Sequence, residues 1–274
     1  MDAPLTIPTP KNISFEQAAT LGVGSYTASL GLFEGLNIPP DHPTSNPEPK
    51  DEWVIVFGGA GSVGQYAVQL AKTCGYKVLA SCSEGGEEVS NFPNPLSSYR
   101  IPSSSTPYTV YCPPSDDGTQ LLKSLSATAT LNHTLDHANQ LAAIRSLTGG
   151  NFSRVFDAAG YSYPLAAKAL SEISTAAGPK YFTTTDDWSP LDEIPGTKTH
   201  RITLGPIGRE GEEKLHENIK KYIPVIKTLV EEGTVFTNGV EVLGEGGIEG
   251  LKGVLEKGEK GEKGKKGVVM VGGV

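Results

Sequence analysis

The chain has 274 residues, of which 37% are hydrophobic, with three cysteines and a formal net charge of −8. This length can bury the core of one large domain or two modest ones, while the acidic balance argues against a nucleic-acid surface. No apolar run approaches the ~20 residues that cross a membrane, no signal peptide is recognisable, and sparse cysteines without a C-x-x-C pair indicate a cytoplasmic protein with no zinc site of that kind.

The N-terminal residues predict a helical lead-in followed by a proline-rich connector. Ser14 and Gln17 have the spacing of a capping box, which predicts the start of a short helix. Gly22 and Gly24 should break this helix, because glycine weakens a helix interior. A second helix is expected over residues 26–36.

The stretch after the connector carries the strongest signal in the chain. An apolar run at 53–57 predicts a buried strand, and Gly59, Gly61 and Gly64 form G-x-G-x-x-G directly after it, followed by helical spacing and a second strand at 76–83. In this context the glycines make a tight turn, let a pyrophosphate approach the backbone and let the helix pack on the sheet. The alternative is a structural glycine turn that binds nothing. The residues expected to contact a dinucleotide here are Gly59, Ala60, Gly61, Ser62, Val63 and Gly64.

Strands alternate with helices along most of the remaining chain. This alternation predicts an α/β fold, a doubly wound parallel sheet of the Rossmann type. Residues 84–118 are rich in proline and serine without periodicity, which predicts an inserted surface loop. The other expected elements are a helix at 119–125, a strand at 129–131, a helix at 135–147, a strand and turn at 155–160, a helix at 164–173, strands at 180–184 and 199–204, a helix at 210–232, a strand at 240–243, a helix at 248–256 and a strand at 268–271.

Several motifs resemble the medium-chain dehydrogenase/reductase superfamily, in the zinc-free quinone-oxidoreductase-like branch that includes the fungal trans-acting enoyl reductases. The Gly-Gly-Ile-Glu-Gly sequence at 246–250 is fairly specific for the fungal members. The resemblance implies a zinc-independent reductase that transfers a hydride from a nicotinamide cofactor to an activated C=C or a quinone. Its substrate would be a small molecule, such as a carrier-bound or thioester acyl chain. The matching stretches are 18–21, 26–28, 54–67, 80–83, 121–125, 155–160 and 246–251.

Members of this superfamily begin with a GroES-like catalytic domain that forms one wall of the active-site cleft, and here we expect only remnants of it. We divide the chain into a helical lead-in and connector (1–47), a dinucleotide-binding domain (48–204) and a C-terminal segment returning toward the catalytic domain (205–274). The strands near Val240 and Val268 should then have edges that are unpaired, or covered by a partner protein or a second copy. The alternative function is a truncated cofactor-binding chain without catalysis, acting as a partner subunit. A methyltransferase with a similar turn is a weaker alternative, because the third glycine and the Ser-Cys-Ser strand end count against it.

The residue about twenty positions beyond the glycines selects between the nicotinamide cofactors. Ser83 occupies it and, with Ser81, offers hydroxyl groups that suit the 2′-phosphate of NADPH. His133 stands where similar enzymes have a tyrosine on that phosphate. Glu84 would favour NADH if it pointed inward. We therefore expect NADPH in preference to NADH.

The resemblance also implies that Thr27 approaches the nicotinamide and that the turn Asp157, Ala158 and Gly160 lines the cofactor ribose. Thr27 could instead bond its own helix backbone, and Asp157 could instead cap the following helix.

Two further residue pairs carry side chains that could bind a metal or transfer a proton. His133 and His137 could share a helix face as metal ligands do, but no third ligand is near, so a solvated pair and no metal are expected. Tyr161 and Tyr163 could donate a proton, although a packing or surface role is preferred. The sequence assigns no catalytic residue.

Overall fold

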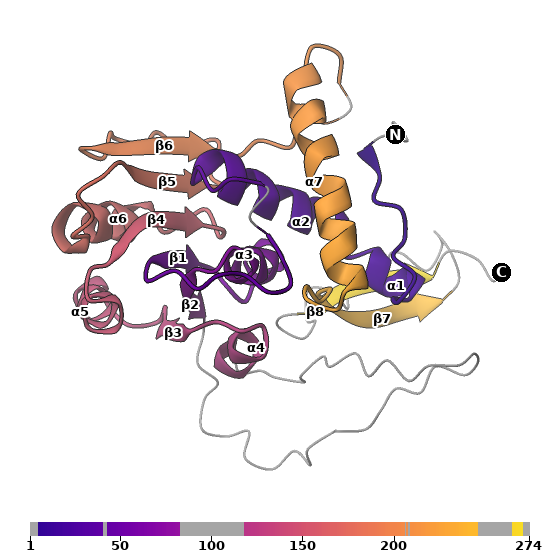
Figure 1. Cartoon of the computed structure of the whole chain (residues 1–274), viewed down its shortest axis with the longest axis horizontal. Coiled ribbons are helices and arrows are strands. Elements are labelled where there is room, and N and C mark those ends of the chain that lie inside the picture. The colour runs from indigo at the N-terminus through magenta and orange to yellow at the C-terminus, as the bar shows by residue number, and fades with distance from the viewer. Residues whose placement is uncertain are drawn as a thin grey trace.

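The structure is a computed structural model of the chain, and it describes residues 5–40, 43–82, 118–205, 207, 209–245 and 265–270. Its centre is a six-stranded sheet in the order β3-β2-β1-β4-β5-β6, in which every adjacent pair is parallel. Figure 1 shows the six strands stacked in that order, from β6 at the top to β3 at the bottom. The predicted doubly wound α/β fold is confirmed. The strands are β1 (Trp53–Phe57), β2 (Lys77–Cys82), β3 (Ala129–Asn132), β4 (Phe152–Asp157), β5 (Lys180–Thr184) and β6 (Thr197–Arg201).

Helices cover both faces of this sheet. In β1 the side chains alternate between two buried clusters, with Val54 and Val56 in one and Ile55 and Phe57 in the other, as a strand buried on both faces requires. The first cluster includes residues of α3 and α4, and the second includes residues of α5, α6 and η4. These helices are α3 (Ser62–Thr73), α4 (Gly118–Ser124), α5 (His137–Thr148), α6 (Tyr163–Lys168) and the π-helix η4 (Ala169–Ile173).

The N-terminal lead-in forms α1 (Phe15–Ala18), α2 (Gly22–Ser29) and the π-helix η2 (Leu30–Gly35). The capping box at α1 is confirmed, because the Ser14 hydroxyl accepts the Gln17 amide at 3.3 Å and the Gln17 side chain accepts the Ser14 amide at 2.8 Å. The prediction that Gly22 and Gly24 break the helix is wrong, since both lie inside α2. A Cβ on Gly24 would lie 3.0 Å from the Ser62 hydroxyl oxygen, so this glycine allows α2 to pack directly on α3.

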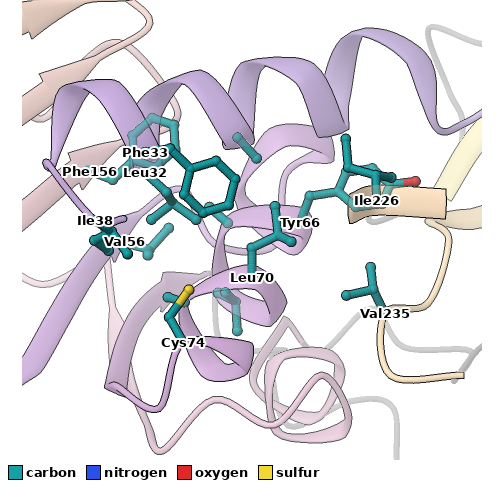
Figure 2. Packing of buried hydrophobic residues seen from close by; sticks show 14 of the residues in the cluster. Leu32, Phe33, Ile38, Val56, Tyr66, Leu70, Cys74, Phe156, Ile226 and Val235 are labelled. Atoms are coloured by element: carbon teal, nitrogen blue, oxygen red, sulfur yellow. The ribbon is translucent and has the colours of Figure 1, made fainter. Parts of the chain in front are cut away.

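The C-terminal segment packs its long helix against α2. Helix α7 (Glu213–Glu231) continues through Pro224 and buries one apolar face. Figure 2 shows Tyr66 and Leu70 of α3 between Phe33 on one side and Ile226 and Val235 on the other. The strands β7 (Gly239–Glu245) and β8 (Lys265–Met270) pair in parallel with each other as a separate two-stranded sheet beside α1 (Figure 1).

Parts of the prediction concern residues that the structure does not describe. The expected loop at 84–118 falls almost entirely on them, and so does the expected helix at 248–256. In the described part of the chain, β7 has β8 as its only strand partner, and β8 has only β7. Coverage of their outer edges by a partner stays a prediction.

Two neighbouring threonines of β5 differ in their hydrogen bonds and provide a test of the core. Thr183 and Thr184 are both fully buried. The Thr184 hydroxyl accepts the Asp186 amide at 3.0 Å and bonds Asp157, while the Thr183 hydroxyl has no partner among the described residues. Thr183→Val should therefore raise the free energy of unfolding by about 1 kcal/mol, and Thr184→Val should lower it by about 1–3 kcal/mol. Urea unfolding measures both, and equal losses in the two variants would contradict the assigned bonds.

Candidate functional site

The glycine-rich turn after β1 is held from two sides. Gly58 has φ +72°, a left-handed conformation that favours glycine. The Gly59 amide donates to the Ser81 carbonyl oxygen at 2.8 Å, and the Gly61 amide donates to the Gly58 carbonyl oxygen at 3.0 Å. The turn is thus fixed at the carboxyl ends of β1 and β2.

The third glycine of the motif allows the closest backbone approach. A Cβ on Gly64 would lie 2.6 Å from the Gly59 Cα, a distance that real Cβ atoms do not adopt. Gly61 is exposed, and a Cβ there would meet only the Gly58 carbonyl oxygen, at 3.2 Å. The left-handed residue of the turn is thus Gly58, one position before the motif, while Gly64 lets α3 pack closely on the turn as expected. The approach of a pyrophosphate to Gly59 and Gly61 stays a prediction.

Helix α3 begins at the open side of this turn. Gly61 precedes its first residue, Ser62, with an extended backbone and no side-chain cap. Within the described residues, the amides of Ser62 and Val63 have no backbone acceptor, as expected in the first turn of a helix. Free amides and the positive end of the helix dipole favour an anion here.

The hydroxyl group of Ser81 bonds the turn itself. Ser81 is 3% exposed, and its hydroxyl oxygen accepts the Gly58 amide at 2.9 Å. Ser83 and Glu84 lie outside the described residues. The His133 amide donates to the Cys82 carbonyl oxygen at 3.0 Å, so this exposed histidine lies beside the carboxyl end of β2. Contact of these side chains with a ribose phosphate stays a prediction.

Asp157 organises the turn that follows β4. Its carboxylate is fully buried and accepts the Gly160 amide at 3.0 Å, the Ser162 amide at 2.9 Å and the Thr184 hydroxyl at 3.3 Å. Burial raises the pKa of Asp157, and these hydrogen bonds oppose the rise. The side chain thus holds the turn after β4, but it does not cap the following helix, because the N-cap of α6 is Ser162 without a side-chain hydrogen bond. Contact of Asp157, Ala158 and Gly160 with a ribose stays a prediction.

Thr27 lies in α2, one turn after Gly24, which packs on Ser62. Its hydroxyl donates to the Val23 carbonyl oxygen at 2.7 Å, and the residue is 6% exposed. Thr27 therefore bonds the backbone of its own helix, as the alternative expected. An approach of the Thr27 side chain to a nicotinamide stays a prediction.

The two histidine and tyrosine pairs do not form clusters. His133 lies in the turn before α5 and His137 is the first helical residue, so the alternative of a shared helix face does not hold. Both histidines are exposed, as the preferred interpretation of a solvated pair expected. In the parts of the chain that the structure describes, no group of three His, Cys, Asp or Glu residues could hold a metal ion. Tyr161 is 83% exposed, whereas the Tyr163 hydroxyl donates to the Asp192 carbonyl oxygen at 2.9 Å.

A contact that sequence reasoning missed joins α3 to the C-terminal segment. The Asn238 side-chain amide donates to the Ser62 hydroxyl oxygen at 2.8 Å and to the Ser62 carbonyl oxygen at 3.2 Å. No local pattern indicates this contact, because its two residues are 176 positions apart.

Comparison with known proteins gives partial sequence matches. No protein-family profile matches the chain. The trans-enoyl reductase TOXD of Cochliobolus carbonum is 41% identical over 75 residues, which cover 27% of this chain and 24% of that protein. The trans-enoyl reductase resD of Aspergillus sclerotiorum is 24% identical over 268 residues, which cover 91% of this chain and 65% of that protein. The chain is thus similar to two proteins that are named trans-enoyl reductase. The resemblance inferred from the sequence is confirmed.

Solved structures of medium-chain enzymes share the fold. The CurK enoyl reductase matches with a TM-score of 0.63 at 17% identity, over 97% of this chain and 66% of that chain. A quinone oxidoreductase of Pseudomonas syringae matches with a TM-score of 0.60 at 16% identity, over 96% of this chain and 67% of that chain. The chain spans less than two thirds of the length of the two trans-enoyl reductases, TOXD and resD. Among the described residues, no helix is both long and apolar enough to cross a membrane.

Proposed function

We propose that the chain is an NADPH-dependent oxidoreductase that transfers a hydride, without zinc, to an activated C=C such as an enoyl thioester, or to a quinone. The observation that carries the proposal is the turn from Gly58 to Gly64, which opens onto the N-terminus of α3. It lies where the strand order reverses between β1 and β4, the position at which doubly wound sheets bind ligands.

The accessible backbone and the amide donors of the turn support binding of a dinucleotide. Gly61 leaves the backbone accessible, and the amides of Ser62 and Val63 offer donors for a pyrophosphate. The turn Ala158–Gly160 would line the ribose at the neighbouring strand end, and Thr27 would border the nicotinamide. When bound, a reduced nicotinamide supplies the hydride, and the protein binds and orients it.

The preference for NADPH rests on Ser83 and on the exposed His133 beside the end of β2. An acid at the deciding position would repel a 2′-phosphate, and Ser83 is uncharged. The substrate class rests on the relatives, which are named trans-enoyl reductase and quinone oxidoreductase. A carrier-bound acyl thioester is the form of substrate that we propose to test first.

A binding titration tests the cofactor. The purified chain is titrated with NADPH and, separately, with NADH, while the fluorescence of the reduced nicotinamide is followed. We expect NADPH to bind at least tenfold more tightly, a difference of about 1.4 kcal/mol. Tighter binding of NADH would reverse the cofactor preference, and binding of neither would refute the dinucleotide site.

A turnover assay tests the reaction. NADPH oxidation is followed with a trans-2-enoyl thioester, free and carrier-bound, and with a quinone, each with and without a zinc chelator. Acceptor-dependent oxidation that is unaffected by the chelator is expected. Binding without oxidation of NADPH on any acceptor would favour the alternative, a cofactor-binding chain that acts as a partner subunit.

A further inference from the structure

The segment that precedes β7, residues 236–238, is held along one side of helix α3 by hydrogen bonds. The Gln69 side chain exchanges two hydrogen bonds with the Phe236 backbone, donating at 3.1 Å and accepting at 2.7 Å. The backbone amide of Asn238 donates to the Tyr66 hydroxyl oxygen at 3.3 Å. The Asn238 side chain reaches the first residue of the helix, Ser62. Three successive turns of α3 therefore hold this segment.

The direction of the bond between Asn238 and Ser62 follows from their chemistry. An amide nitrogen can only donate, so the Ser62 hydroxyl oxygen must accept. Rotating the side-chain amide of Asn238 by half a turn would bring its oxygen against the Ser62 carbonyl oxygen. Two acceptors would then face each other, which is unfavourable. The Ser62 hydroxyl proton has no acceptor within the described residues, so it remains available to a ligand.

Asparagine at position 238 lowers the stability of the fold, because one of its side-chain polar atoms is buried without a partner among the described residues. It is 2% exposed, and its side-chain oxygen has no hydrogen-bond partner in the described part of the chain. A buried acceptor without a partner destabilises a protein. The side-chain nitrogen of Asn238 therefore bonds Ser62 while its own oxygen stays without a partner in the described part of the chain. This is expected if the role of Asn238 is to orient Ser62.

We propose that Asn238 is a positioning residue for dinucleotide binding: it makes the Ser62 hydroxyl a donor toward the pyrophosphate at the N-terminus of α3. This inference rests on the proposed dinucleotide function and deepens it. The C-terminal segment thereby contributes to the phosphate site without touching the ligand.

A double-mutant cycle on Asn238→Ala and Ser62→Ala tests the proposal, with NADPH affinity as the readout. Each single variant should bind NADPH about tenfold more weakly, as loss of a hydrogen bond to a charged group predicts. In the Ser62→Ala background, Asn238→Ala should change the affinity less than about twofold, because its target hydroxyl is gone. Equal losses with and without the Ser62 hydroxyl would overturn the proposal, and so would unchanged affinity in Asn238→Ala.

Gln69→Ala is the matched control. It removes two hydrogen bonds to the same segment without touching Ser62. We expect a lower thermal midpoint with NADPH affinity within about twofold of the wild type, because the structural and positioning roles separate at this residue. A loss of affinity in Gln69→Ala that follows its thermal midpoint would reduce Asn238 to a structural role.

Asn238→Asp provides a second variant of nearly the same volume, should Asn238→Ala not fold. A carboxylate only accepts, so it would accept the hydrogen bond from the Ser62 hydroxyl and add a negative charge near the pyrophosphate. Its affinity should fall below that of Ser62→Ala, and an affinity at or above the Ser62→Ala level would overturn the proposal. A wild-type chain that binds neither NADPH nor NADH would instead refute the proposed function and this inference together.

Discussion

Replacing Gly64 with alanine should abolish dinucleotide binding and lower the free energy of unfolding by about 3 kcal/mol. The new methyl group would lie 2.6 Å from the Gly59 Cα and would also meet the Gly58 carbonyl oxygen. Both neighbours are backbone atoms, which cannot turn away as a flexible side chain can. Alanine gains about 1 kcal/mol over glycine in a helix interior, and this gain is smaller than the cost of the overlap.

Gly61→Ala is the matched variant at the same turn. Gly61 has φ −72°, which alanine adopts freely, and the new Cβ would meet only the Gly58 carbonyl oxygen at 3.2 Å. We expect a loss of about 1 kcal/mol or less in the free energy of unfolding, since alanine is a poorer N-cap than glycine. Its methyl group would stand where the pyrophosphate approaches the backbone, so NADPH affinity should fall at least tenfold.

Urea unfolding and NADPH titration of the two variants separate folding from binding. A Gly64→Ala chain as stable as the wild type would contradict the close contact between α3 and the turn. Unchanged NADPH affinity in Gly61→Ala would mean that the pyrophosphate does not lie on this turn, and the dinucleotide site would have to be withdrawn.

The sequence predicted the elements whose signals are local. The apolar run of β1, the glycine motif and the helical spacing after it lie within one short stretch, so their order was readable without tertiary information. The helix break at Gly22 and Gly24 was predicted wrongly because the gain from packing α2 on α3 outweighs the poor helix propensity of glycine. Propensity describes an isolated segment, and here a distant helix decides.

The candidate site was predicted in residue type more than in role. Ser81 and Asp157 were expected to face the cofactor, and the structure adds a structural role for each: the Ser81 hydroxyl accepts the Gly58 amide, and the Asp157 carboxylate accepts the Gly160 amide. A sequence gives the donors and acceptors of a side chain and not the groups that already bind them. The contact of Asn238 with Ser62 depends on how the C-terminal segment docks, which no local pattern encodes.

Asp157→Ala should lower the free energy of unfolding by about 3 kcal/mol and weaken dinucleotide binding. The substitution leaves the amides of Gly160 and Ser162 without the carboxylate that accepts them. A relaxed turn no longer lines the end of β4, where the ribose is proposed to lie. Asp187→Ala is the control: this exposed residue lies only three positions after Thr184, and the stability and NADPH affinity of the variant should match those of the wild type.

The pH dependence of this loss has a definite sign. Burial holds the pKa of Asp157 in the folded chain above its unfolded value near 3.8, so the folded state keeps this proton more tightly. The contribution of the group to stability is then fully present below the unfolded pKa and decreases as the pH rises through the folded pKa. The difference in unfolding free energy between wild type and Asp157→Ala should therefore be larger at about pH 4 than at about pH 7. Urea unfolding at both pH values measures this difference, and a larger difference at neutral pH would mean that the hydrogen bonds to the ionised carboxylate outweigh its burial.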